Sequence, residues 1–159
     1  MTKTPSFKQL LVNPVQMLAF GFGSGLAKKA PGTMGTLAAI PMYYCLIRFF
    51  ESWYLAVLVL TVVLGIWICG KAAKDIGVHD HGGIVWDEIV GYLLTMYWVP
   101  FSWQNVILGF VFFRLFDILK PWPINWLDLH VSGGAGIMLD DVVAALMAAA
   151  CLHFTLGLI

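Results

Sequence analysis

The stretch Gly133-Gly134-Ala135-Gly136-Ile137-Met138-Leu139-Asp140-Asp141 places two adjacent carboxylates at the start of a segment with no further Asp, Glu, Lys or Arg up to Ile159. A carboxylate entering the apolar part of a bilayer costs roughly 3 kcal/mol, and far more if it stays ionised and unpaired. The pair therefore predicts a cation or a metal ion nearby. We expect the fold to bring matching groups to this position.

Matching groups lie at the edges of two other apolar runs. Asp87 and Glu88 open one run, and Arg114, Asp117 and Lys120 lie near the end of another. The last three are spaced i, i+3, i+6, which places them along one face of a helix. One interpretation is an internal ladder of ion pairs. A functional site is favoured, because a ladder alone would not account for acidic pairs at two other helix starts.

The composition is that of a membrane protein. Of 159 residues, 60% are hydrophobic and only 11% are charged, and the mean hydropathy is +0.86, well beyond the usual soluble range. The length predicts one domain, residues 1–159. The net charge of zero gives no general attraction for nucleic acid. Three scattered cysteines without CxxC spacing argue against a disulfide framework or a thiolate metal site: Cys45, Cys69 and Cys151.

The apolar segments predict an all-α, polytopic membrane bundle of about five helices. They are Leu37 to Phe50, Trp53 to Gly70, Ile84 to Pro100, Gln104 to Leu119, and a last helix from about Ile137. The second has 18 residues without a charge, enough to span a bilayer, whereas some others are short and would tilt or insert partway. A short interfacial helix is expected at Pro14 to Phe20, with apolar side chains such as Phe20 and Phe22 among acyl chains.

The distribution of basic residues predicts the orientation. With the N-terminus in the cytoplasm and five crossings, almost all lie on one side: Lys3, Lys8, Lys28, Lys29, Lys71, Lys74, Arg114 and Lys120. Only Arg48 lies near the other side, so the positive-inside rule supports this arrangement. It also gathers all the acidic groups at the cytoplasmic face, where they would form one site.

A glycine-rich loop from Gly21 to Leu37 would face the same side. Glycine backbone and a helix start can bind an anion, and lysine adds charge. The candidate phosphate-binding residues are Gly23, Ser24, Gly25, Lys28, Thr33, Gly35 and Thr36. The loop departs from the P-loop consensus, and a flexible loop whose glycines permit tight helix packing is an equally good interpretation.

His79-Asp80-His81 lies in a polar loop before the third apolar segment. Alternate residues of a loop can converge on a transition metal. Two nitrogen ligands without a third at helical spacing are a weak signal, so solvated loop histidines are the favoured interpretation.

The chain resembles the phosphatidylglycerophosphatase A family in four long motifs. They are Gly23-Ser24-Gly25 with Ala30-Pro31-Gly32-Thr33-Met34-Gly35-Thr36-Leu37; Ile84-Val85-Trp86-Asp87-Glu88 with Gly91; Phe113-Arg114-Leu115-Phe116-Asp117-Ile118-Leu119-Lys120-Pro121-Trp122-Pro123; and the opening stretch, Gly133 to Asp141. Together they extend over roughly residues 20 to 145. The resemblance implies a magnesium-dependent, all-helical, multi-pass enzyme of the bacterial inner membrane. Such an enzyme removes the terminal phosphate of phosphatidylglycerophosphate and leaves phosphatidylglycerol.

Carboxylates without thiolates suit a hard cation such as Mg²⁺. The expected metal ligands come from Asp87, Glu88, Asp117, Asp140 and Asp141. Adjacent residues on a helix point about 100° apart, so one member of each acidic pair would bind metal while the other caps, pairs with a cation or acts through water. Arg114, Lys120 and Lys28 would offset charge on the phosphoryl oxygens. A metal-bound water is the preferred nucleophile, and a carboxylate nucleophile stays open.

Two other functions share some of these features. An ion-coupled transporter would place charged groups at several depths, whereas the acids here gather at one edge. Another enzyme of phospholipid head groups, such as a transferase, would need the same metal and anion sites, and release of free phosphate would distinguish the two reactions. The sequence predicts no particular oligomeric state.

Overall fold

The computed structural model describes residues 4–78 and 81–157, so Lys3, His79 and Asp80 of the sequence analysis lie outside it. The described residues form helices and no strands, which confirms the all-α class. The α-helices are α1 (Phe7–Val12), α2 (Pro14–Ala19), α3 (Pro31–Phe49), α4 (Tyr54–Ile76), α5 (Trp86–Thr95), α6 (Trp103–Leu119), α7 (Ile124–His130) and α8 (Gly133–Thr155). Two 3₁₀ helices, η1 (Gly21–Leu26) and η2 (Glu51–Trp53), connect them.

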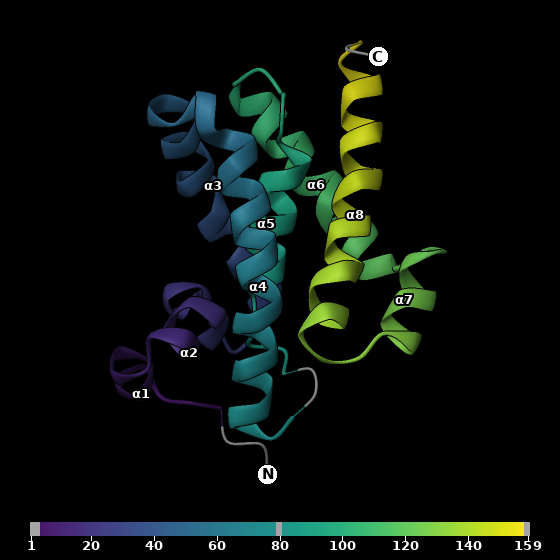
Figure 1. Ribbon diagram of the computed structural model, residues 1–159. Helices are drawn as coiled ribbons and strands as arrows, with labels where there is room; N and C mark the ends of the chain where they lie inside the picture. Colours follow the sequence, from purple (N-terminus) through teal and green to yellow (C-terminus); the bar gives the residue numbers. More distant parts are fainter. Residues whose placement is uncertain (1–3, 79–80, 158–159) are drawn as a thin grey trace.

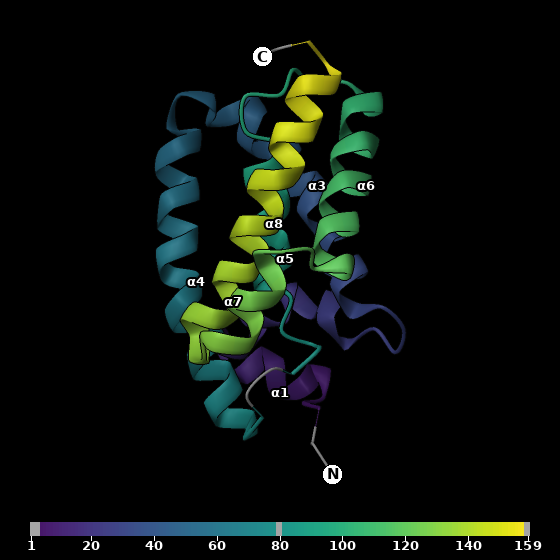
Figure 2. The same cartoon turned by 90° about the vertical axis from the view of Figure 1, so that its right-hand side faces the viewer.

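Helix α8 is the centre of the bundle. It packs against α4, α5, α6 and α7, and α3 covers the other side of α5. The short helices α1, α2 and α7 gather at one end, and the C-terminal end of α8 lies at the opposite end (Figures 1 and 2). The first turns of α3, α5 and α8 and the last turn of α6 all lie toward the end with the short helices (Figure 1). The polar ends of four helices therefore share one end of the molecule.

Small residues allow the central helices to approach closely. A Cβ on Gly134 of α8 would overlap the carbonyl oxygen of Ile66 and lie 2.7 Å from the backbone nitrogen of Gly70, both on α4. A Cβ on Gly91 of α5 would lie 2.6 Å from the Phe113 ring of α6. Such contacts are typical of helix association in lipid, where packing and not the hydrophobic effect holds helices together.

Among the described residues, two helical segments are long and apolar enough to cross a membrane, Glu51–Ile76 and Gly133–Thr155. The first keeps large apolar side chains exposed along its length, including Leu55, Val59 and Val63. In contrast, α5 has 10 residues and extends for roughly 15 Å. It ends at Thr95, well before the Pro100 expected from the apolar run, and the chain then turns at Trp98, which has a φ of 63°.

The N-terminal segment differs from expectation in one side chain. Helix α2 matches the expected interfacial helix within a residue, but Phe20 is fully buried. Its ring packs against His81 at a centroid distance of 5.6 Å and would touch a Cβ on Gly83. The prediction that Phe20 inserts among acyl chains is therefore wrong, whereas Phe22 is 55% exposed.

Two helices begin a turn or more before the expected residue, and one helix was not expected. Helix α3 begins at Pro31 instead of Leu37. Proline suits the first turn of a helix, because the backbone N–H that it lacks would have no partner within the helix at that position. Helix α8 begins at Gly133 instead of Ile137. The segment around Asp128, which lies between the expected helices, forms helix α7.

Candidate active site

Three carboxylates converge where α5 begins and α8 passes it. Asp87 and Glu88 lie in the first turn of α5, and one oxygen from each of Asp87, Glu88 and Asp141 lies within 4.8 Å of the others. We call these three residues the acidic cluster. Three oxygens in the cluster are buried and have no hydrogen-bond partner: Asp87 Oδ1, Glu88 Oε2 and Asp141 Oδ2. The two neighbours on α5 thus point to one region after all, because the longer glutamate side chain can reach back toward the aspartate.

This arrangement needs a compensating cation. Two ionised carboxylates at 4.8 Å repel each other by roughly 3 kcal/mol at an effective dielectric constant of 20. Buried carboxylate oxygens without donors add a further cost. Oxygen ligands from several carboxylates suit Mg²⁺. The donor set and the unpartnered oxygens therefore fit a hard divalent cation.

Arg114 links α6 to the acidic cluster. Its Nη1 donates to Asp117 Oδ2 and lies 3.9 Å from Glu88 Oε1. Its Nε is buried and has no hydrogen-bond partner. Asp117 in turn lies close enough to Asp141 for the two carboxylates to interact. Asp117 thus orients the guanidinium, which keeps an unused donor next to the cluster.

Lys120 forms a separate bridge and does not share Asp117 with Arg114, as the alternative ladder of ion pairs would require. It ends α6 in the left-handed conformation, with a φ of 42°. Its Nζ donates to Asp128 Oδ1 of α7 at 2.7 Å and to Asp140 Oδ2 of α8 at 2.8 Å. Burial alone would lower the pKa of the ammonium, but these two carboxylates raise the pKa above its ordinary value. Lys120 therefore stays charged and holds α6, α7 and α8 together beside the acidic cluster.

Asp140 and Asp141 have different surroundings although they are adjacent. Asp140 accepts from Lys120, and its Oδ1 accepts from the backbone N–H of Asp141 at 3.0 Å. Asp141 is buried and points into the acidic cluster. One carboxylate is thus occupied by a lysine, while its neighbour has an unpartnered oxygen.

The start of α3 completes the site through Gly32, which was not among the residues predicted to bind phosphate. A Cβ on Gly32 would overlap the Glu88 carboxylate and lie 3.1 Å from Arg114 Nη1. Gly32 and Thr33 lie in the first turn of α3, where backbone N–H groups have no partner within the helix. The sequence signal for Gly32 is its place directly after the proline that starts the helix.

The other candidates from the glycine-rich loop mainly support its packing. The Ser24 hydroxyl donates to the Gly21 carbonyl and the Thr36 hydroxyl to the Gly32 carbonyl, each at 2.9 Å. A Cβ on Gly25 would overlap the Gly83 carbonyl oxygen, and one on Gly35 would lie 2.6 Å from the Val85 side chain. The loop therefore packs closely against the segment that leads into the acidic cluster.

Two further candidates lie in the same loop. Gly23 has a φ of 98°, which favours glycine. Lys28 is exposed, and no contact between Lys28 and the acidic cluster is present in the described structure.

Comparisons with known proteins identify the family of the chain. A model of the phosphatidylglycerophosphatase A family matches residues 17–156. Phosphatidylglycerophosphatase A of Escherichia coli is 50% identical over 143 residues, which cover 89% of this chain and 83% of that protein. Phosphatidylglycerophosphatase A of Haemophilus influenzae is 45% identical over 151 residues, 93% of each chain. No solved structure matches the chain. The chain therefore belongs to the phosphatidylglycerophosphatase A family.

Proposed function

We propose that this chain hydrolyses the terminal phosphate monoester of phosphatidylglycerophosphate, in a magnesium-dependent reaction at the cytoplasmic face of the membrane. The family and the names of its relatives give the reaction and the lipid substrate. The observation that carries the assignment to this site is the acidic cluster, whose buried oxygens have no partner next to an arginine with a free donor.

Asp87, Glu88 and Asp141 would hold the magnesium ion. Bound there, Mg²⁺ would polarise the phosphoryl group and offset its negative charge. Asp117 and Asp140 have other roles in this proposal, because each already accepts a hydrogen bond from a cationic side chain. The five predicted metal carboxylates thus divide into three that bind metal and two that orient Arg114 and Lys120.

Arg114 binds the phosphoryl group in this proposal. Its buried Nε can donate to a phosphoryl oxygen, and an arginine fork matches the geometry of phosphate. The first backbone N–H groups of α3, at Gly32 and Thr33, lie next to it and favour negative charge. The substrate phosphate would then lie between the acidic cluster and the start of α3.

The distribution of charge supports a multi-pass protein with the site in the cytoplasm. In the described part of the chain, the end with the site carries Lys8, Lys28, Lys29, Lys71, Lys74, Arg114 and Lys120. The opposite end carries Arg48. By the positive-inside rule the lysine-rich end faces the cytoplasm. Helix α5 and the short helices would then lie within or against the bundle instead of crossing the bilayer independently.

The substrate would enter from the side. Each acyl CH₂ exposed to water costs about 0.8 kcal/mol, so the lipid keeps its chains in the bilayer while the head group is bound. Large apolar side chains are exposed around this end of the bundle, among them Phe22, Trp122 and Trp126. We propose that they form the lipid-facing rim of the entrance.

The test is release of phosphate from phosphatidylglycerophosphate in vesicles by purified protein. Asp87→Asn and Asp141→Asn should abolish release, because each removes a metal ligand, while the folded helix content stays unchanged. Glu51→Gln is the matched control, since Glu51 is an exposed carboxylate at the opposite end. Normal turnover in both cluster variants would contradict the assignment. Transfer of the head group without free phosphate would indicate a transferase instead.

A further inference from the structure

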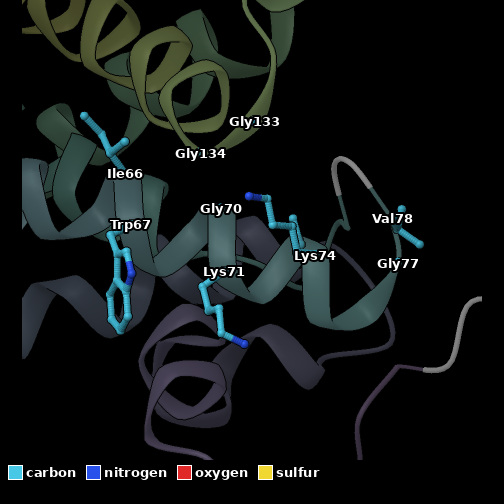
Figure 3. Close-up of a pocket in the computed structure, with 10 residues that line it drawn as sticks. Ile66, Trp67, Gly70, Lys71, Lys74, Gly77, Val78, Gly133 and Gly134 are labelled. Atoms are coloured by element: carbon cyan, nitrogen blue, oxygen red, sulfur yellow. The ribbon is translucent and has the colours of Figure 1, made fainter.

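A groove between α4 and α8 lies outside the acidic cluster. Its volume is about 490 Å³. The residues that line it include Ile66, Trp67, Gly70, Lys71, Lys74 and Gly134. Figure 3 shows the Lys74 side chain reaching toward the start of α8, whereas Lys71 points to another side of α4. We call this space the α4–α8 groove.

The groove combines an apolar wall with a free positive charge. Trp67 is 59% exposed and Ile66 is 39% exposed, so the wall lies open to the surroundings of α4. Lys71 pairs with Asp75. Lys74 pairs with no carboxylate in the part of the chain that the structure describes. The groove therefore has an excess of positive charge and suits a ligand that is both anionic and apolar.

The depth of the groove matches the boundary of a bilayer. Lys74 lies 20 residues after Tyr54 on one continuous helix, which corresponds to roughly 30 Å along its axis, the thickness of the hydrocarbon core. Trp67 precedes Lys74 by seven residues, roughly 10 Å along the axis. If α4 crosses the bilayer, Lys74 lies among lipid head groups while Trp67 and Ile66 lie among acyl chains.

We propose that the α4–α8 groove binds an anionic phospholipid of the cytoplasmic leaflet. The lipid phosphate contacts Lys74, and the acyl chains extend along Ile66 and Trp67. This site goes beyond the phosphatase reaction and shares with it only the placement of this end of the bundle at the head-group layer.

The groove and the acidic cluster share helix α8. Cys69, next to Gly70 of the groove, contacts Met138 of α8 at 3.9 Å between the sulfur atoms. Met138 precedes Asp141 by less than one turn. Gly134 lines the groove on the same helix, so a lipid in the groove packs against the helix that carries Asp140 and Asp141.

The experiment uses the full-length protein in nanodiscs and Trp67 as the reporter. Phosphatidylcholine is the host lipid, and phosphatidylglycerol or phosphatidylcholine with brominated acyl chains is the quencher. The difference between the wild type and Trp67→Phe isolates the Trp67 fluorescence. We expect brominated phosphatidylglycerol to quench Trp67 at lower mole fraction than brominated phosphatidylcholine does.

The variants test the role of the lysine. Lys74→Gln should reduce the preference for phosphatidylglycerol about fivefold, the factor expected for one basic residue at an anionic lipid surface. Lys74→Arg should restore the preference. Lys8→Gln, which removes an exposed lysine of α1 outside the groove, should leave it unchanged. Asp141→Asn should also keep the preference, so this proposal and the phosphatase proposal fail independently.

Four outcomes would overturn the proposal. Equal quenching by the two brominated lipids would mean that the groove does not select anionic lipid. An unchanged preference in Lys74→Gln would exclude the lysine as the contact. Abolition of the preference by inorganic phosphate would indicate a site for a free anion. Protection of Trp67 from both lipids would indicate that a second copy of the chain covers the groove.

Discussion

Replacement of Asp141 by asparagine should make the magnesium-free protein more stable and its stability indifferent to magnesium. In the wild type, the Asp141 carboxylate lies within 4.8 Å of an oxygen of Asp87 and of Glu88. Each such pair is worth roughly 3 kcal/mol of repulsion at an effective dielectric constant of 20. Asparagine keeps the shape of the side chain and removes the charge, so the repulsion is lost while the packing is kept.

Only part of this repulsion will be measured, because protons and small structural adjustments relieve the rest in the absence of metal. We expect a net gain of about 1–2 kcal/mol, typical of a stabilising change at a functional site. For a chain of this size that corresponds to a rise in melting temperature of about 2–8 °C. Magnesium at a hundredfold excess over its dissociation constant should stabilise the wild type by about 2.7 kcal/mol.

The assay is thermal unfolding in detergent, followed by far-ultraviolet circular dichroism, with chelator and then with magnesium. Glu51→Gln serves as the control for the loss of one negative charge and should respond to magnesium like the wild type. A melting temperature of Asp141→Asn that falls in chelator, or that rises with magnesium as much as in the wild type, would refute the metal-binding role of the cluster.

Three further predictions test the parts around the acidic cluster. Arg114→Lys keeps the charge but loses the fork, so turnover should fall at least about tenfold while the melting temperature stays near that of the wild type; normal kinetics with a lowered melting temperature would mean a purely structural arginine. Gly32→Ala introduces a Cβ that overlaps the Glu88 carboxylate and should reduce turnover. Gly82→Ala, with nothing within 4 Å of the added Cβ, should leave turnover unchanged. Equal turnover in the two variants would mean that the start of α3 is not part of the site. Phe22→Asp should weaken turnover of bilayer-embedded substrate more than turnover of a short-chain soluble analogue. Equal loss on both substrates would mean that Phe22 is not part of the lipid entrance. Phe20→Asp should unfold the protein, because that ring is fully buried.

The gathering of charged groups at one end could be predicted from the sequence. Apolar segments that alternate with short loops force the chain back and forth, and most charged groups, Asp87 and Arg114 among them, lie near the segment edges on one side. The described structure brings these two residues to the same site, with Arg114 3.9 Å from Glu88. The long apolar helices α4 and α8 could also be predicted from the sequence, because their apolar segments are longer than most buried helices.

The division of roles among the carboxylates could not be predicted in this way. The i, i+3, i+6 spacing left open a ladder in which Lys120 and Arg114 share Asp117, but Lys120 ends its helix in the left-handed region and reaches two other helices. One of its partners, Asp128, lies on a helix of seven residues, too short to produce a clear periodic pattern. The position of Lys120 thus depends on tertiary contacts, which cannot be predicted from the spacing of residues along one helix.

The burial of Phe20 escaped prediction for a different reason. In a membrane protein the lipid and the protein interior are both apolar, so hydrophobicity does not tell a lipid-facing side chain from a buried one. Phe20 and Phe22 are separated by one residue, yet one is fully buried and the other is 55% exposed. The difference arises from the turn at Gly21, which has a φ of 53° and redirects the chain.

The most direct test of the central claim is release of phosphate from phosphatidylglycerophosphate as magnesium is titrated into chelator-treated protein. The account predicts no release without a divalent cation and a saturable recovery as magnesium is added. The same titration should give no recovery for Asp87→Asn and full recovery for Glu51→Gln. Undiminished phosphate release in excess chelator, or a recovery in Asp87→Asn equal to that of the wild type, would contradict the claim that the acidic cluster binds the metal on which the reaction depends.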